Sequence, residues 1–235
     1  MVKLTLKLPL LLLLFSCSNP GGVKPSSDTI SIPESLEIDS SIVEMPKDII
    51  VVHDTSFVDL LDYTNEISLD FRYADTNNFI HQKVYDCVQC LLRKEVVEGL
   101  VKANSSLKER SLRLRLFDCY RPKSVQFKMW EIYPDARYVA NPNKKGSIHN
   151  RGGAVDLTLE TIDGEQLDMG TDFDHFGKEA HIDYKELSDT VLSNRKILRD
   201  AMSQAGFTPI RTEWWHFNFG NSKKYNISNF PFDCE

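Results

Sequence analysis

The alternation of apolar and polar residues predicts several strands in this chain. Residues 112–116 read Leu-Arg-Leu-Arg-Leu, which places three leucines on one face of a strand and two arginines on the other. Residues 67–73 alternate less strictly, and we expect a strand there as well. A further strand, rich in aromatic residues, is expected at 213–219.

The strand expected at 153–159 has two unlike faces. Val155, Leu157 and Leu159 are apolar and are expected to face the core. The side chains between them include Asp156, which is expected to project from the opposite face. A carboxylate on a well-anchored strand is held rigidly, as a metal or substrate ligand must be.

Apolar residues at helical spacing predict three helices. We expect them at 91–103, at 123–133 directly after Pro122, and at about 187–205 before Gly206. Helices and strands are mixed along the chain without regular β-α-β alternation. We therefore expect an α+β fold, with a mixed or antiparallel sheet flanked by helices.

Residues 1–16 have the pattern of an export signal. Lys3 and Lys7 give a positive start, and an apolar run follows at 8–15. This run is too short to cross a bilayer core of about 30 Å. Residues 14–17, Leu-Phe-Ser-Cys, resemble a bacterial lipoprotein box. We therefore expect cleavage before Cys17 and acylation of that residue, with the membrane as a partner through the lipid anchor.

The next segment, 17–46, is rich in proline, glycine and serine, as in a flexible tether. Residues 47–235 are enough for one folded domain with a substantial core. We expect an exported protein that is lipid-anchored to a bacterial membrane on its periplasmic or cell-surface side.

The other cysteines suggest structural disulfides in any of three pairings; they are Cys87, Cys90, Cys119 and Cys234.

The overall charge argues against a nucleic-acid partner. The chain has 28 Lys and Arg against 34 Asp and Glu, a net charge of −6 that becomes −8 when Lys3 and Lys7 leave with the signal. No basic stripe is present of the kind that nucleic acid requires. No segment indicates an obligate protein partner either.

Two short segments carry metal-ligand chemistry. Residues 147–156 contain His149 and Asp156, and residues 213–216 read Glu-Trp-Trp-His. Together they offer two imidazoles and a carboxylate as ligands, with a second carboxylate three residues before the last histidine. These are the components of a catalytic zinc site with an open fourth position and a nearby general base.

The spacing within each segment requires a change of backbone direction. His149 and Asp156 are seven residues apart and would face opposite sides of one straight strand. The glycines at 152–153 permit a tight redirection between them. Glu213 and His216 are three residues apart, so either a bulge separates them or Glu213 lies on the preceding loop. The aromatic neighbours of Glu213 are expected to raise the pKa of its carboxyl.

Two further segments have alternative interpretations. Arg121 lies between a predicted strand and a predicted helix. It is either an ordinary salt-bridge residue or a cation aimed at the negative charge that develops on a carbonyl oxygen. The loop at 169–177 contains several acids, which either are simply solvated or bind a cation or a substrate ammonium.

Taken together, these segments resemble the bacterial D-alanyl-D-alanine dipeptidases, zinc enzymes associated with vancomycin resistance and with the scavenging of peptidoglycan dipeptides. The Ser-x-His-x₆-Asp and Glu-x-x-His patterns are shared across a wider group of zinc D,D-peptidases with a Hedgehog-like α+β fold. Tyr-Arg-Pro at 120–122, Met-Gly-x-x-Phe-Asp at 169–174 and Glu-Trp-Trp-His at 213–216 point more narrowly to the dipeptidases. Asn-Arg at 194–195 also matches.

The resemblance implies a role for each residue of the metal segments. His149, Asp156 and His216 would hold one Zn²⁺ per chain. Glu213 would be the base that takes a proton from water and passes it to the leaving amine.

The resemblance also implies how substrate is held. Arg121 would stabilise the oxyanion, Ser147 would contact substrate, and Asp174 would receive the free ammonium of a dipeptide. The leading hypothesis is hydrolysis of D-alanyl-D-alanine to two D-alanines in cell-wall peptide metabolism. One alternative is a zinc carboxypeptidase acting on peptidoglycan stem peptides. The other is a non-catalytic zinc-binding module that recognises wall peptides, which would have no need for a base such as Glu213.

Overall fold

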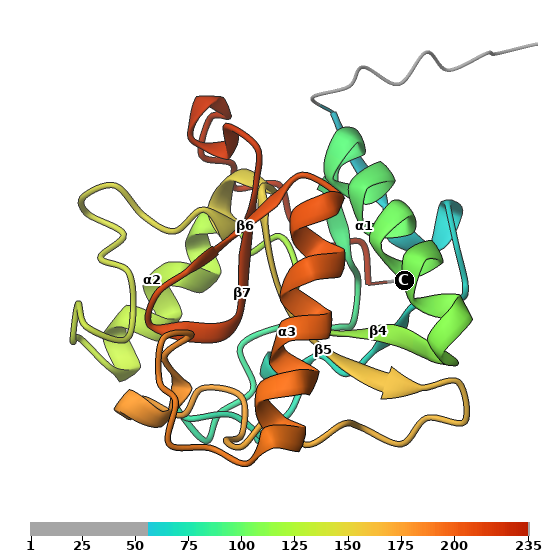
Figure 1. Ribbon diagram of the computed structural model, residues 1–235. Coiled ribbons are helices and arrows are strands. Elements are labelled where there is room, and N and C mark those ends of the chain that lie inside the picture. Colours follow the sequence, from blue (N-terminus) through green and yellow to red (C-terminus); the bar gives the residue numbers. More distant parts are fainter. Residues whose placement is uncertain (1–55, 235) are drawn as a thin grey trace, which may run out of the picture. The chain divides into compact units, whose positions relative to one another are not determined.

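The structure is a computed structural model and describes residues 56–234 (Figure 1). The expected signal, the acylation site at Cys17 and the tether at 17–46 lie outside the described residues. None of the helices within 56–234 is long and apolar enough to cross a lipid bilayer.

A five-stranded mixed sheet forms the centre of the domain, in the order β2-β4-β5-β7-β6. Its first strand is parallel to its neighbour and the other neighbours are antiparallel. The strands are β2 (Ser68–Leu69), β4 (Leu112–Asp118), β5 (Ala154–Thr161), β6 (Phe207–Ile210) and β7 (Glu213–Phe219). A separate antiparallel pair consists of β1 (Phe57–Asp59) and β3 (Leu91–Arg93). The predicted α+β class with a mixed sheet is confirmed.

The prediction of a strand at 67–73 is wrong beyond Leu69, where β2 ends. The chain leaves the sheet there and forms a 3₁₀ turn, Arg72–Ala74. Its backbone groups find partners in a neighbouring loop, because the carbonyl of Tyr73 accepts hydrogen bonds from the amides of both Val84 and Tyr85. This turn brings the Tyr73 side chain toward the site described below.

Three helices accompany the sheet: α1 (Lys94–Leu107), α2 (Lys123–Ile132) and α3 (Asp189–Gln204). The first was expected to begin at residue 91, but 91–93 form β3, because an apolar run that short is compatible with either element. The last ends before Gly206, whose φ of +95° suits glycine. In Figure 1, α1 and α3 lie side by side, and their buried side chains pack on the sheet.

Both faces of β5 are buried. Val155, Leu157 and Leu159 join the apolar core, as predicted. Asp156 and Glu160 are also buried, on the face away from that core. The sheet therefore holds polar side chains in a fixed, water-poor setting on one side, and that side carries the candidate site.

The four cysteines within 56–234 form two disulfides, Cys90–Cys119 and Cys87–Cys234. The predicted structural role is confirmed, and the neighbouring cysteines at 87 and 90 pair with distant partners rather than with each other. The first bridge is buried at both ends, whereas Cys234 in the second is exposed.

Candidate active site

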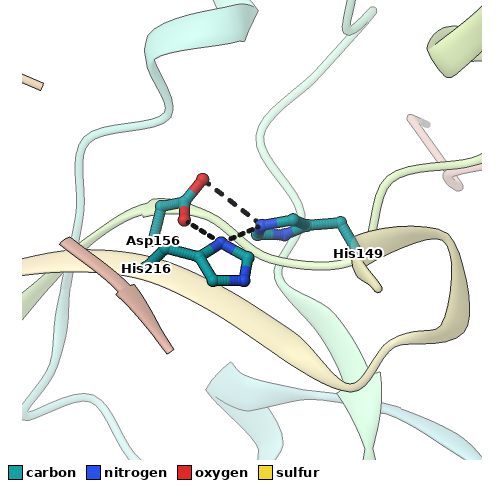
Figure 2. A group of neighbouring side chains, drawn as sticks. All are labelled: His149, Asp156 and His216. Atoms are coloured by element: carbon teal, nitrogen blue, oxygen red, sulfur yellow. Dashed lines mark hydrogen bonds and ion pairs between the residues drawn. The ribbon is translucent and has the colours of Figure 1, made fainter. Parts of the chain in front are cut away.

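Two imidazoles and one carboxylate converge at one end of the central strands (Figure 2). The donor atoms of His149, Asp156 and His216 all lie within 4.8 Å of one another. Asp156 on β5 is directly opposite His216 on β7, so the two side chains lie on the same face of the sheet. All three residues are at most 8% exposed.

The separations between these donor atoms fit a zinc ion. His149 Nε2 lies 3.2 Å from His216 Nδ1 and 3.3 Å from Asp156 Oδ2, and His216 Nδ1 lies 2.9 Å from Asp156 Oδ1. Two ligands about 2.0–2.1 Å from a tetrahedral ion lie about 3.3 Å apart. Two imidazoles and a carboxylate are also a donor set that zinc accepts in catalytic sites. The three residues therefore fit one Zn²⁺.

His149 reaches the site through the glycine redirection that the sequence predicted. It begins a 3₁₀ turn, His149–Arg151, which ends at Gly152 in the left-handed region with φ +65°. A Cβ at Gly152 would lie 2.4 Å from the Phe57 ring, so a larger residue would displace the neighbouring strand. The turn bends the chain back into β5, which carries Asp156.

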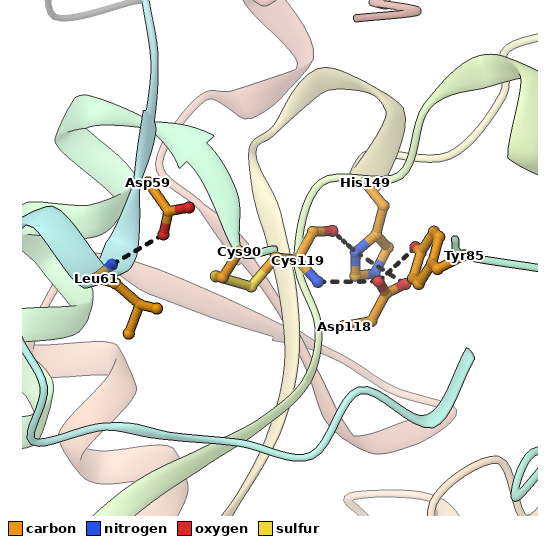
Figure 3. The surroundings of a disulfide bond; sticks show 7 residues. All are labelled: Asp59, Leu61, Tyr85, Cys90, Asp118, Cys119 and His149. Carbon is orange, nitrogen blue, oxygen red and sulfur yellow. Dashed lines mark hydrogen bonds and ion pairs between the residues drawn. A yellow bond between two sulfur atoms is a disulfide. The ribbon is translucent and has the colours of Figure 1, made fainter. Parts of the chain in front are cut away.

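Each imidazole has a second partner that fixes its orientation. His149 Nδ1 donates to the carbonyl oxygen of Cys119 at 2.7 Å, which leaves Nε2 free to face the site. Figure 3 shows that Cys119 is tied in turn to Cys90 by the buried disulfide. His216 Nε2 is 3.1 Å from the amide oxygen of Asn218, which leaves Nδ1 for the site. Such partners hold a ligating histidine in one tautomer and one orientation.

Glu213 lies beside the metal ligands because of a bulge in β7. Pro209 is opposite Phe217, but the next residue, Ile210, is opposite Glu213, so β7 has extra residues at this point. Glu213 Oε2 lies 4.0 Å from His216 Nδ1. Burial raises the pKa of the Glu213 carboxyl above its ordinary value, as its aromatic neighbours suggested.

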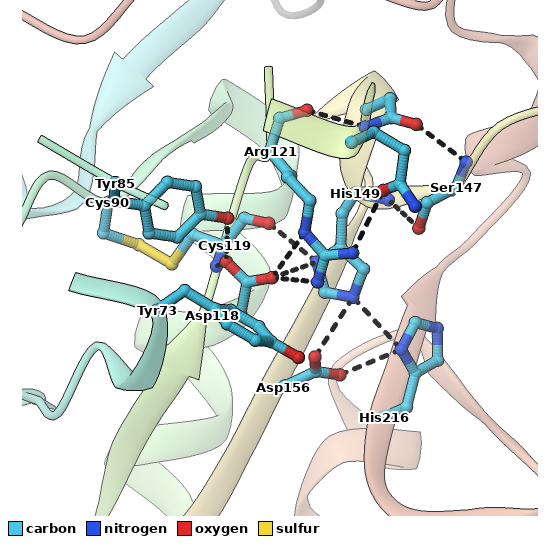
Figure 4. A network of polar contacts seen from close by, with 12 residues as sticks. Tyr73, Tyr85, Cys90, Asp118, Cys119, Arg121, Ser147, His149, Asp156 and His216 are labelled. Carbon is cyan, nitrogen blue, oxygen red and sulfur yellow. Dashed lines mark hydrogen bonds and ion pairs between the residues drawn. A yellow bond between two sulfur atoms is a disulfide. The ribbon is translucent and has the colours of Figure 1, made fainter. Parts of the chain in front are cut away.

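Arg121 is buried and lines the same cavity, so it is not an ordinary surface residue (Figure 4). Its guanidinium donates to Asp118 through Nε and Nη2, and to the amide oxygen of Gln126 through Nη1 at 3.0 Å. Burial lowers the pKa of Arg121, but the charge of Asp118, together with Tyr85, Tyr73 and Asp156, more than offsets burial and raises that pKa well above its ordinary value. A fully charged cation is thus held in a fixed direction.

Asp174 lines the same cavity and pairs with Tyr73. The Tyr73 hydroxyl donates to Asp174 Oδ2 at 2.8 Å. The backbone of Asp174 is in the left-handed region, with φ +60°. Burial, together with the charge of Asp156, raises the pKa of the Asp174 carboxyl well above its ordinary value. No local sequence pattern indicates a role for Tyr73, because it contacts a residue that is 101 positions away in the chain.

All seven site residues predicted within the described chain line one cavity of about 330 Å³. They are Arg121, Ser147, His149, Asp156, Asp174, Glu213 and His216. Ser147 contacts the metal segment, because its hydroxyl oxygen accepts from the His149 amide at 3.2 Å. A cavity with a few convergent charged groups on a largely buried wall is typical of a small-ligand site.

Four aromatic rings, which we call the aromatic clasp, pack against one another; they are Phe79, Tyr133, Tyr138 and Phe176. Phe176 meets Phe79 and Tyr138 with ring centroids 4.8 and 4.4 Å apart. The rings come from three separate loops, so no sequence pattern identified them together. Two rings of the clasp, Tyr138 and Phe176, line the cavity.

A buried triad of zinc-compatible donors with an adjacent carboxylate and a fixed arginine defines a metallopeptidase type of centre. A family profile for peptidase M15, described as D-ala-D-ala dipeptidase, matches residues 53–233. The chain belongs to this family, and the resemblance inferred from its motifs is confirmed.

Three relatives bear the name D-alanyl-D-alanine dipeptidase. The Escherichia coli K12 protein is 33% identical over 180 residues, which cover 77% of this chain and 93% of the relative. The Enterococcus faecalis V583 protein is 31% identical, with 70% and 91% covered. The Enterococcus faecium protein is also 31% identical, with 75% and 96% covered. The similarity thus spans nearly the whole length of each relative.

Proposed function

We propose that this protein is a zinc-dependent dipeptidase that hydrolyses D-alanyl-D-alanine to two D-alanines in cell-wall peptide metabolism. The observation that carries the proposal is the single cavity in which a zinc-compatible triad, a buried carboxylate at Glu213 and a buried cation at Arg121 face a second carboxylate at Asp174. Membership of the dipeptidase family and the three dipeptidase relatives support the choice of substrate.

Each residue of the site has a separate role in hydrolysis. When bound by His149, Asp156 and His216, zinc would polarise the peptide carbonyl and lower the pKa of a water to about 7. Glu213 takes a proton from the attacking water and passes it to the nitrogen of the leaving amino acid. Its raised pKa suits both steps, since a carboxylate of ordinary pKa would return the proton poorly near neutral pH.

Arg121 stabilises the charge that develops on the carbonyl oxygen. It is already held by Asp118 and Gln126, so little reorganisation is needed when the charge appears. Asp174 takes the free ammonium at the other end of the dipeptide, with Tyr73 fixing one carboxylate oxygen. Ser147 contacts substrate beside His149.

The proposal is tested with purified residues 47–235, free D-Ala-D-Ala and N-acetyl-D-Ala-D-Ala. We expect zinc-dependent turnover of the free dipeptide and little turnover of the acetylated one, because acetylation removes the charge that pairs with Asp174. Faster turnover of the acetylated peptide would instead indicate a carboxypeptidase that acts on stem peptides. Binding of wall peptides with no turnover would indicate a recognition module.

We further propose that the protein is exported and anchored to a membrane through an acylated Cys17. The signal-like segment at 1–16 and the lipoprotein-type box at 14–17 support this proposal. Two disulfides are also typical of an oxidising compartment. The test is expression of the full chain and of Cys17→Ala in a bacterium, followed by fractionation and mass spectrometry of the N-terminal peptide. Equal membrane association of both, with no lipid on Cys17, would refute the anchor.

A further inference from the structure

Arg195 on α3 is a buried cation that forms no direct ion pair among the described residues, although the charge of Asp168 acts on it. Its side chain is largely shielded from solvent, because the residue is only 7% exposed. Its Nε donates to the carbonyl of Met169 at 2.7 Å and its Nη1 to the carbonyl of His181 at 3.3 Å. The guanidinium carbon lies 5.8 Å from the centre of the Trp214 ring. A charge buried in this way costs stability, so a packing role alone does not account for it.

The two carbonyls that Arg195 holds are the two ends of one loop. We call this segment, 169–181, the selector loop, because it carries Asp174 and Phe176 of the cavity wall. Arg195 therefore closes the base of the loop, and the planar guanidinium can serve both carbonyls at once. Burial lowers the pKa of Arg195 to about 10, with the charge of Asp168 acting in the opposite direction, so the side chain is still charged at neutral pH.

Neighbouring contacts reinforce this closure. Asn194 Nδ2 donates to the carbonyl of Asp168 at 2.8 Å, just before the loop begins. Trp214 Nε1 donates to the hydroxyl of Thr171 at 2.8 Å. Gly170 lies so close to α3 that a Cβ there would be 2.8 Å from Val191. The start of the selector loop is thus fixed both to α3 and to β7.

We propose that Arg195, assisted by Asn194, is the positioning residue for Asp174. It sets the distance between the carboxylate that receives the substrate ammonium and the metal centre, and so determines the preference for a free dipeptide. Arg195 does not touch the cavity and acts only through the selector loop. This inference rests on the proposed dipeptidase function, since it assumes that Asp174 binds the ammonium.

The test compares Arg195→Met and Arg195→Lys with Lys196→Met, a matched control at the next, exposed position of the same helix. In Arg195→Met we expect KM for D-Ala-D-Ala to rise at least tenfold, since small displacements of a binding group cost up to about 10²-fold. The preference for the free over the N-acetylated dipeptide should fall by a similar factor. The value of kcat should stay within about threefold and the zinc content should be unchanged. Arg195→Lys should be intermediate because an ammonium serves one carbonyl better than two.

Several results would overturn the proposal. One is an unchanged KM and preference with only a lower Tm, which would make Arg195 a packing residue. Another is loss of zinc together with kcat, which would place its effect at the metal centre.

If Arg195→Met does not fold, Asn194→Ala and Arg195→Lys decide: a rise in KM with loss of preference supports the proposal, and no shift overturns it. If the unmodified protein does not hydrolyse free D-Ala-D-Ala, the dipeptidase function fails and the role of Arg195 fails with it. Normal turnover by the unmodified protein with unchanged constants in the variants overturns the role of Arg195 alone.

Discussion

Two parts of the cavity wall, which we call the metal end and the amine end, are held by different kinds of structure. At the metal end, Asp156 and His216 project from paired strands, and each imidazole has a second partner that fixes its orientation. At the amine end, Asp174 lies on a loop between β5 and α3, in a left-handed backbone conformation, and its carboxylate accepts a hydrogen bond from Tyr73. In the proposed mechanism, the chemistry thus depends on the sheet, whereas the choice of substrate depends on a loop that distant side chains hold in place.

The largest effect is expected at the metal end, from Glu213→Gln. Loss of the base should lower kcat by about 10³- to 10⁴-fold. The zinc content should stay at one ion per chain, because the amide leaves the three ligands in place. Metal analysis alongside single-turnover kinetics checks this, and loss of zinc would show that Glu213 is a ligand rather than a base.

The next effect should come from Asp118→Asn, behind the metal end. The variant weakens the hold on Arg121 and leaves a buried guanidinium without its charged partner. We expect a loss of about 10²-fold in kcat, in the range of a lost oxyanion donor. Unfolding in denaturant measures the accompanying loss of stability. A variant with full kcat would show that Arg121 needs no support from Asp118.

Asp174→Asn should affect binding more than turnover. Loss of the charge that pairs with the ammonium should raise KM by about 10- to 100-fold, the range for a hydrogen bond between charged groups. Asparagine also tolerates the left-handed backbone at this position. If kcat falls instead and KM is unchanged, Asp174 belongs to the chemical step.

The same variant should be more stable than the unmodified protein at neutral pH. Burial raises the pKa of Asp174 in the folded state, so the fold loses stability as the pH rises from the ordinary carboxyl pKa towards that raised value. The stability advantage of Asp174→Asn should therefore be present at pH 7 and should vanish as the pH falls toward the ordinary carboxyl pKa of about 3.9. Thermal unfolding across this pH range measures the stability difference. A difference that is independent of pH would show that the ionisation of Asp174 is not its cause.

The smallest effect is expected from removal of the disulfides, and the two should differ in their influence on zinc affinity. Replacing Cys90 and Cys119 by alanine should weaken zinc binding about tenfold, because the Cys119 carbonyl orients His149. Replacing Cys87 and Cys234 should leave zinc affinity unchanged, although this bridge closes a loop of 147 residues against 29 for the other. Competition with a chelator provides both affinities, and equal losses in the two variants would indicate a general loss of stability.

The sequence predicted the metal end far better than the amine end. His149 with Asp156, and Glu213 with His216, lie in short segments whose spacing required a turn and a bulge, and the structure has both. Two other contacts join residues that are far apart in the chain. Tyr73 donates a hydrogen bond to Asp174, and Arg195 donates hydrogen bonds to the selector loop. No periodicity encodes such contacts, because they depend on how the loops pack.

Some elements were ambiguous for a physical reason. The strand expected at 67–73 keeps only two residues in the sheet, since its later backbone groups bond to the loop at 84–85. The leucines at 91–92 suit a strand or a helix equally, and pairing with β1 decides between the two. Regular local patterns therefore predicted secondary structure correctly. In short segments, the type of element depended on tertiary contacts that the local sequence does not show.

The central claim is that His149, Asp156 and His216 hold the catalytic zinc. X-ray absorption spectroscopy at the zinc edge of the loaded protein tests it most directly. We predict two imidazole nitrogens and a small number of oxygens at about 2.0–2.1 Å, with one zinc per chain. A sulfur ligand at about 2.3 Å, or a shell with no imidazole, would contradict the account.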